Sequence, residues 1–165
     1  MKSLDHQFKH LYEANYNKVL RLCLGYTSGD TMLSKDLTQE VFIKVWQNLE
    51  SFRQESSIST WIYKIAVNTC LLELRKKKTI GISDHLNHLE QPLENTSANM
   101  DIKLKQLYSC IGCLKPENKS IILLELEGLP QKEIAEITGL SHEAIRVRIH
   151  RIKNELTKCV KNDNI

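Results

Sequence analysis

The sequence predicts an all-α protein with two small helical domains joined by a flexible linker. Apolar residues recur at helical spacing on both sides of a central segment. That segment, residues 79–102, lacks helical periodicity and contains four acidic residues but no Lys or Arg. A length of 165 residues also suffices for two small domains. We therefore expect domains over 1–78 and 101–165, with a linker over 79–100 that is too long for an ordinary turn.

The first helical pattern of the N-terminal domain ends at a break marked by Gly25 and Gly29. The next predicted helix lies within SKDLTQEVFIKVWQNLESF, and its inward face is expected to comprise Phe42, Val45, Trp46 and Leu49. Another face of this helix carries Asp36, Gln39, Glu40 and Ile43. An isoleucine exposed among acids suits contact with a partner helix. The alternative is that this face is an ordinary solvated surface.

A polar loop, FRQESSIST, precedes a helix that begins with aromatic residues and ends in the cations of Arg75 to Lys78. From Thr60 to Lys78 there are five basic residues and one acidic residue. Cations with interleaved aromatic rings suit single-stranded nucleic acid, because the cations follow the backbone while the rings stack on unpaired bases. The alternative is that Trp61 belongs to the core and the lysine run complements the dipole at the helix C-terminus.

Residues 130–157 predict a helix, a tight turn and a second helix. Gly139 can adopt the positive φ that ends the first helix, and the Ser141 hydroxyl can cap the second. The second helix has one narrow apolar stripe, which comprises Ile145, Ile149, Ile152 and Leu156. From Ser141 to Lys161 there are six Lys or Arg and two Glu, which suits a helix that enters a DNA major groove. The alternative is a solvated amphipathic helix in an ordinary bundle.

The composition, with 41% hydrophobic and 26% charged residues, is that of a soluble globular protein. No signal peptide is visible in MKSLDHQFKH, and no apolar run approaches the roughly 20 residues of a membrane span. We therefore expect a cytoplasmic protein without membrane insertion. The chain also shows no glycine-rich phosphate loop, metal-ligand set or nucleophile elbow. We accordingly predict no catalytic residue, no metal and no cofactor.

The five cysteines are irregularly spaced, so we expect reduced thiols rather than a disulfide framework. Cys110 and Cys113 form a CxxC pair, which is a weak metal signal because a closed zinc site needs four ligands. The nearest histidine pair, His85 and His88, lies in a different segment. We expect the CxxC cysteines to be small apolar positions on a buried helix face, with redox or metal sensing as the alternative.

With these motifs the chain resembles the extracytoplasmic-function (ECF) sigma factors, the small two-domain members of the bacterial sigma-70 family. The resemblance rests on DLTQEVFIKVW, on FRQESSISTWIYKIAVNT and on GLPQKEIAEITGLSHEAIRVRIHRIKNEL. It implies a sigma region 2-like bundle over 1–78 that binds core RNA polymerase and recognises and melts the downstream promoter element. It also implies a region 4-like helix-turn-helix over 101–165 that recognises the upstream promoter element.

The resemblance implies three sets of contact residues. The helix carrying DLTQE would dock on the clamp helices of the largest polymerase subunit through Asp36, Gln39, Glu40 and Ile43. The single strand, including a flipped base, would be held by Arg53, Ser56, Ser57, Trp61, Lys64 and Asn68. The duplex of the upstream element would be contacted by His142, Glu143, Arg146, Val147, Arg148, His150 and Arg151. Further implied partners are the flap of core polymerase and an anti-sigma factor that clamps both domains.

Two other functions must be weighed. A stand-alone helix-turn-helix regulator would have no use for DLTQEVF joined to WIYKIAVNT. A site-specific recombinase would need a catalytic serine or tyrosine with converging arginines, and Ser56, Ser57 and Ser59 lack that constellation. As a departure from the family, Pro130 replaces a capping hydroxyl, so we expect a slight boundary shift. We also expect the free protein to bind promoters poorly, because its two modules are held at no fixed separation.

Overall fold

The computed structural model describes residues 2–80 and 98–162, and every regular element within these ranges is a helix. The N-terminal half comprises α1 (Lys2–Tyr26), α2 (Thr31–Asn48), the short 3-10 helix η1 (Leu49–Ser51) and α3 (Ile58–Ile80). The C-terminal half comprises α4 (Ala98–Gly112), α5 (Pro116–Leu126), α6 (Gln131–Thr138) and α7 (His142–Asn162). The predicted all-α fold is confirmed. Residues 81–97, which include most of the predicted linker as well as His85 and His88, lie outside the described residues.

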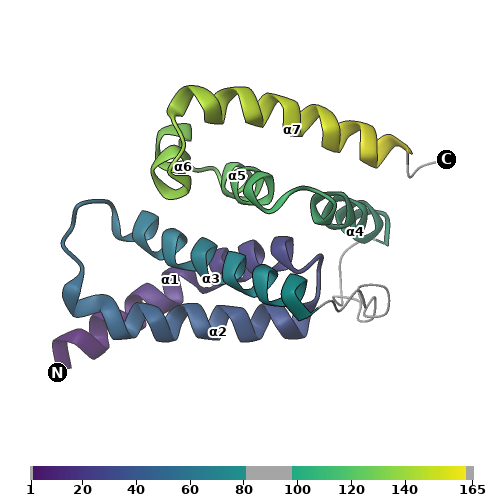
Figure 1. Ribbon diagram of the computed structural model, residues 1–165. Helices are drawn as coiled ribbons and strands as arrows, with labels where there is room; N and C mark the ends of the chain where they lie inside the picture. Colours follow the sequence, from purple (N-terminus) through teal and green to yellow (C-terminus); the bar gives the residue numbers. More distant parts are fainter. Residues whose placement is uncertain (1, 81–97, 163–165) are drawn as a thin grey trace.

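Helices α1, α2 and α3 pack on one another, and α4, α5 and α6 pack under α7 (Figure 1). In this arrangement α4, α5 and α6 lie between α7 and the N-terminal half, so α7 is on the far side of the molecule (Figure 1). The apolar stripe predicted for α7 is buried in full, which confirms it. None of the helices in the described ranges is long and apolar enough to cross a membrane.

Local signals set several helix ends. The Asp30 carboxylate caps α2 by accepting a hydrogen bond from the Leu33 N–H (3.1 Å). Gly139 ends α6 with φ 76°, and the Ser141 hydroxyl caps α7 by accepting from the Ala144 N–H (3.2 Å), as predicted. Pro130 precedes α6 without a side-chain cap, in agreement with the expected loss of a capping hydroxyl.

One residue of the predicted inward face of α2 lies elsewhere. Phe42, Val45 and Leu49 are buried, whereas Trp46 is 41% exposed. The Trp46 ring packs edge-on against Phe8 of α1 at a centroid distance of 5.2 Å, at the margin of the helix pair. The prediction was wrong for Trp46. Helix α2 buries the stripe that runs through Val41 and Val45, and the next position, 46, lies further around the helix and outside that stripe.

The two halves share one hydrophobic core. Helix α1 contacts α4 and α5, and α3 contacts α5 and α6. Gly25 lies within α1 where a Cβ would be only 2.1 Å from Leu123 Cδ2 of α5, so the close approach depends on a glycine. The Tyr26 and Ser120 hydroxyls are hydrogen bonded across the same boundary. We expected modules at no fixed separation, and the structure instead holds them together.

The cysteines correct another expectation. Cys110 of α4 and Cys159 of α7 form a disulfide across a Cα–Cα distance of 6.0 Å, so the prediction of reduced thiols was wrong for this pair. Helix packing brings them together over a sequence separation of 49 residues, which spacing along the chain does not indicate. Cys113 is exposed, so only Cys110 occupies the buried position expected of both. Among the described residues, no three His, Cys, Asp or Glu are grouped to hold a metal ion.

A second cysteine pair lies in the core of the N-terminal half. The free thiols of Cys23 and Cys70 are both buried, with their Sγ atoms 3.6 Å apart. The contact with Cys23, followed by burial, raises the pKa of the Cys70 thiol. These two thiols are therefore free, as the sequence predicts, and they pack as small apolar groups.

Candidate functional sites

The four predicted polymerase-contact residues share one face of α2. Asp36, Gln39 and Ile43 are exposed, and the Ile43 side chain reaches 51% exposure. Glu40 is partly covered and forms an ion pair with Lys44 one turn further along (3.2 Å). Spacings of three and four residues place all four on the same side of the helix. This α2 face therefore offers an aliphatic group between acidic and amide groups, as predicted.

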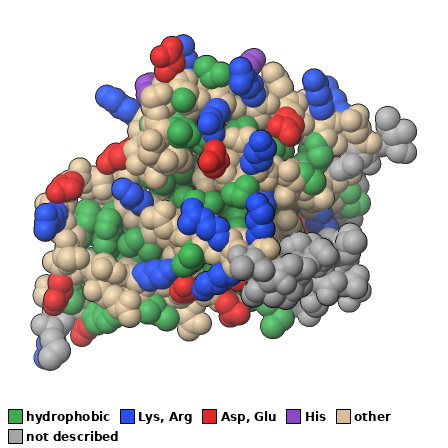
Figure 2. All heavy atoms as spheres, in the orientation of Figure 1, with side chains coloured by type: hydrophobic (Ala, Val, Ile, Leu, Met, Phe, Trp, Pro, Cys, Tyr) green, Lys and Arg blue, Asp and Glu red, His purple; other side chains and the backbone are tan. Residues whose placement is uncertain are grey.

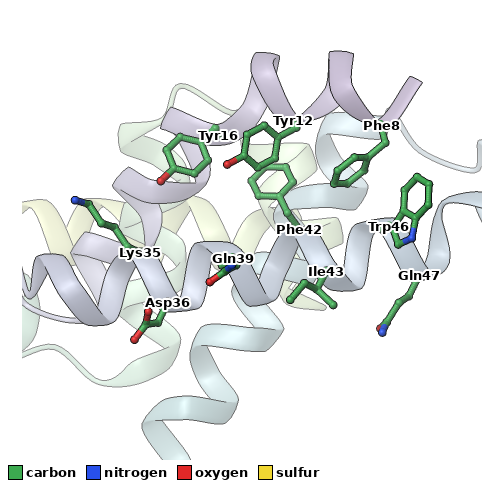
Figure 3. Close-up of a pocket in the computed structure, with 10 residues that line it drawn as sticks. All are labelled: Phe8, Tyr12, Tyr16, Lys35, Asp36, Gln39, Phe42, Ile43, Trp46 and Gln47. Atoms are coloured by element: carbon green, nitrogen blue, oxygen red, sulfur yellow. The ribbon is translucent and has the colours of Figure 1, made fainter. Parts of the chain in front are cut away.

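An aromatic cavity of about 540 Å³ adjoins the α2 face. Figure 3 shows Phe8, Tyr12 and Tyr16 of α1 turned toward Phe42 and Trp46 of α2. The Tyr12 and Phe42 rings are 4.8 Å apart between centroids. Sequence reasoning missed this cavity because it assigned Phe42 and Trp46 to the inward face of their helix. The spacing of the α1 rings at positions 8, 12 and 16 places them in one row and is the signal that could have found it.

The loop before α3 forms a second cavity, of about 260 Å³, which we call the loop pocket. Four of the six predicted single-strand residues line it, namely Arg53, Ser56, Trp61 and Lys64. Phe52 and Trp61 contact each other within it, at a centroid distance of 5.0 Å. The pocket thus combines two cationic side chains and the Glu55 carboxylate with aromatic rings. The cations and the rings are the groups suited to a nucleic-acid strand.

The other two predicted residues lie outside the loop pocket. The Ser57 hydroxyl accepts a hydrogen bond from the Thr60 N–H (3.2 Å) and so caps the start of α3. Asn68 is exposed on α3, one turn beyond Lys64 and therefore on the same side of the helix. Ser57 accordingly fixes the local backbone, while Asn68 extends the exposed face that begins at the pocket.

The C-terminal half also contributes to the loop pocket. Glu136 and Ile137 of α6 line it, and the Thr60 hydroxyl donates a hydrogen bond to Glu133 Oε2 of α6 (3.3 Å). Sequence reasoning missed these residues because Thr60 and Glu133 are 73 positions apart. The pocket therefore holds a carboxylate from α6 beside its own cations.

The predicted duplex-contact residues lie along the outer side of α7. Six of the seven are exposed, namely His142, Glu143, Arg146, Val147, His150 and Arg151, and we call these the α7 face. Val147 is 45% exposed between the arginines. Arg148 differs because it is partly buried and donates to Glu117 of α5 (3.2 Å). Figure 2 shows Lys and Arg side chains both around α7 and at the level of α3.

A bidentate ion pair joins the two halves of the chain. Arg21 of α1 donates from Nε to Glu127 Oε1 (2.8 Å) and from Nη2 to Oε2 (3.0 Å). This hydrogen bonding raises the pKa of Arg21. Burial, together with the nearby Glu127 charge, raises the pKa of Tyr63 to about 12. Glu127 is thus a largely covered anion held between α1, α3 and α4, with its side chain 11% exposed.

Comparisons with known proteins match both halves of the chain. The model of Sigma-70 region 2 matches residues 11–80, and that of Sigma-70 region 4 matches residues 104–156. The ECF RNA polymerase sigma-E factor of Haemophilus influenzae is 32% identical over 161 residues, covering 88% of this chain and 83% of that protein. The chain belongs to the ECF sigma factors.

Other relatives agree with this assignment. RNA polymerase sigma factor YlaC of Bacillus subtilis is 32% identical to this sigma factor over 168 residues, which cover 96% of this chain and 94% of the relative. The sigma factor RpoE in complex with the anti-sigma factor NepR, from Bartonella quintana, has the same fold, with a TM-score of 0.75. Its sequence identity is 20%, over 94% of this chain and 97% of that one. CnrH, in complex with the cytosolic domain of CnrY, gives a TM-score of 0.72 at 19% identity, over 96% of this chain and 90% of that one.

Proposed function

We propose that this ECF sigma factor directs core RNA polymerase to specific promoters through three separate surfaces: the α2 face, the loop pocket and the α7 face. The loop pocket carries the proposal, because its Arg53, Trp61 and Lys64 suit an unpaired strand. A stand-alone helix-turn-helix regulator has no use for such a pocket. In this proposal the predicted domain 1–78 binds the single strand, and the predicted domain 101–165 binds the duplex.

The α2 face is proposed to bind the clamp helices of the largest polymerase subunit. Its Ile43 supplies exposed apolar area, and Asp36 and Gln39 beside it supply polar contacts for orientation. The aromatic cavity alongside enlarges the apolar surface available to a partner helix. Binding there leaves the α7 face uncovered, because α7 is on the far side of the molecule (Figure 1).

The loop pocket is proposed to take a base of the non-template strand of the downstream element. Extruding a base costs a few kcal/mol, which stacking on rings such as those of Phe52 and Trp61 offsets. Lys64 and Asn68, one turn apart on α3, would follow the strand beyond the pocket. Ser56 lines the pocket wall, whereas Ser57 holds the start of α3 in position.

The α7 face is proposed to enter the major groove of the upstream element. Arg146 can donate two hydrogen bonds to guanine, and the Val147 methyl groups can contact a thymine methyl. His142 and Glu143 stand at the N-terminal end of the helix, where such helices touch bases. His150 and Arg151 are about two turns further along. The polymerase flap would hold this half in place.

An anti-sigma factor is proposed as the regulatory partner. One solved structure of the same fold contains a sigma factor bound to an anti-sigma factor, and another contains CnrH bound to the cytosolic domain of CnrY. The exposed α2 face is the surface that such a partner must cover to block polymerase. We further propose that this chain acts in the cytoplasm, where core polymerase works, and catalyses no reaction of its own.

Transcription with core polymerase on fragmented genomic DNA tests the proposed function. Start sites mapped with and without the protein are expected to differ by a set of new starts that share an upstream and a downstream element. Unchanged starts would contradict it. A protein that binds duplex DNA alone and only raises or lowers existing starts would instead be a helix-turn-helix regulator.

A further inference from the structure

Three cysteines lie where α4 packs on α7, and the proposed function uses none of them. Cys110 of α4 is bonded to Cys159 of α7, and Cys113 follows α4 as a free, exposed thiol. The Cys113 N–H donates a hydrogen bond to the Cys110 carbonyl (3.2 Å), so the chain makes an i to i+3 turn between them. Side chains at these two positions of such a turn lie on the same side. The turn therefore places a free thiol beside one end of the disulfide.

The two residues of the disulfide differ in their access to solvent. Cys110 is 2% exposed, whereas Cys159 is partly exposed near the C-terminal end of α7. A dissolved thiol therefore reaches Cys159 more readily than Cys110, but its attack there would release the Cys110 thiolate into a buried position. Burial disfavours a thiolate, so this route is slow. Attack by Cys113 on Cys110 releases the Cys159 thiolate instead, which water can solvate.

A cation also lies near the free thiol. Lys119 of α5 is buried, and burial lowers the pKa of its ammonium group, while the nearby Cys113 thiolate raises that pKa in part. The ammonium and the thiolate therefore attract each other when both are charged. The thiolate is the attacking form in disulfide exchange, and reactive cysteines are typically accessible and close to a cation. Cys113 meets both conditions.

We propose that Cys113, Cys110 and Cys159 form a thiol–disulfide exchange site, at which low-molecular-weight thiols and their disulfides open and close the α4–α7 bond through Cys113. A small thiol can reach a single exposed sulfur without a docking surface. Disulfides of cytoplasmic proteins are usually transient and either catalytic or redox-sensing, which agrees with a bond that has its own exchange thiol. Only this last argument rests on the proposed function, because it uses the proposed cytoplasmic location.

Opening the bond takes three exchange reactions. The Cys113 thiolate attacks Cys110 Sγ, a Cys110–Cys113 disulfide forms, and Cys159 leaves as a thiolate that takes up a proton. A first small thiol then attacks Cys113 Sγ, which gives a mixed disulfide and frees Cys110. A second small thiol attacks the mixed disulfide, which frees Cys113 and gives the small disulfide. The two electrons gained by Cys110 and Cys159 thus come from two small thiols, and closing runs the same steps in reverse.

The first test measures how fast the bond opens in the full-length oxidised protein. Reduced glutathione is added, free thiols are alkylated at timed intervals, and the Cys110–Cys159 peptide pair is quantified by mass spectrometry. Cys113→Ser should slow the opening by at least about tenfold, because a neighbouring thiol acts at an effective concentration far above that of a dissolved one. The final ratio of open to closed protein at a fixed ratio of glutathione to its disulfide should not change.

Ser109→Cys in the Cys113→Ser background is the matched control. Ser109 is exposed and adjoins Cys110 in the sequence, but neighbouring positions on a helix do not face each other. The double variant therefore keeps one exposed thiol in the same segment, yet it should open as slowly as Cys113→Ser. Equal opening rates in the parent and in Cys113→Ser overturn the proposal. So does a double variant that opens as fast as the parent.

The second test traps the intermediates with oxidised glutathione. Cys159→Ser should form a Cys110–Cys113 disulfide, and Cys110→Ser should carry glutathione on Cys113. A Cys159→Ser protein that forms only mixed disulfides with glutathione overturns the proposal. Both tests contain neither polymerase nor DNA, so a failure here leaves the sigma function untouched. Unchanged start sites in the transcription experiment overturn the sigma function and leave the exchange site standing.

Discussion

The loop pocket and the α7 face are two candidate DNA-binding surfaces on one chain, and they differ in access. The α7 face is exposed along its length, and the neighbouring Arg148 forms an ion pair with Glu117. The loop pocket is lined by Glu136 and Ile137 from the other half of the chain. One surface is open to solvent, while part of the wall of the other comes from the opposite half of the chain. The difference teaches that the packing of one chain can leave one candidate DNA-binding surface open while it covers part of another.

The largest expected effect is on the stability of the half that carries the α7 face. Ile152 is 1% exposed in the core, so Ile152→Ala should lower the free energy of unfolding by about 2–5 kcal/mol. Thermal and denaturant unfolding measure this loss of stability. Duplex binding should fall as well, because it depends on the folded half. Val147→Ala, at an exposed position of the same helix, is the control and should change stability by less than about 0.5 kcal/mol.

Reducing the Cys110–Cys159 disulfide should also weaken the C-terminal half selectively. The bond closes a loop with a sequence separation of 49 residues, and loss of such a bond costs about 2–4 kcal/mol. Denaturant unfolding with and without a thiol reductant measures the change. Cys113→Ser, which removes the exposed free thiol, should leave the difference in unfolding between the two conditions unchanged. An identical unfolding midpoint in both conditions would argue against a stabilising bond.

Arg146→Ala tests the duplex surface directly. We expect upstream-element binding to weaken by about 1–3 kcal/mol, with core polymerase binding unaffected. Arg148→Ala is the matched comparison and should have a smaller effect on binding, because that side chain is already held by Glu117. Gel-shift titration on a mapped promoter measures both. Equal losses of duplex affinity in the two variants would mean that the Arg148–Glu117 ion pair breaks when the protein binds DNA.

Trp61→Ala tests the loop pocket in the same way. Removing one stacking ring should weaken single-strand binding by about 1–3 kcal/mol, and duplex binding should not change. Trp46→Ala removes the other tryptophan, which lies beside the α2 face, and should leave strand binding unaltered. If both substitutions weakened strand binding alike, the effect would come from general loss of structure.

Asp36→Arg should give the smallest and most selective change. Reversing a charge at the rim of the α2 face is expected to weaken core polymerase binding by about tenfold, which corresponds to about 1.4 kcal/mol. Pull-down or fluorescence titration with core enzyme measures it. Promoter duplex binding by the free protein should be unchanged, and a loss there would contradict the separation of the two surfaces.

Much of the helix-turn-helix could be predicted from the sequence because its determinants are local. The buried stripe through Ile145, the positive φ at Gly139 and the Ser141 cap each depend on residues within a few positions of one another. The α2 face was also predicted correctly as exposed, because helical periodicity alone places Asp36 and Ile43 on one side.

The remaining features depend on contacts between distant segments. The Cys110–Cys159 bond spans 49 positions, and the hydrogen bond from Thr60 to Glu133 spans 73. Periodicity tells which side of a helix is apolar but not which helix covers it. For the same reason the exposure of Trp46 and the packing of the two halves could not be foreseen.

At position 25 the packing between the two halves leaves very little room for a side chain larger than that of glycine. A single methyl group there would lie 2.1 Å from Leu123 Cδ2, so either the leucine must turn within a filled interior or the two halves must move apart. One base change converts any glycine codon into an alanine codon. A single point mutation at this position would therefore disturb the packing between the two halves of the chain.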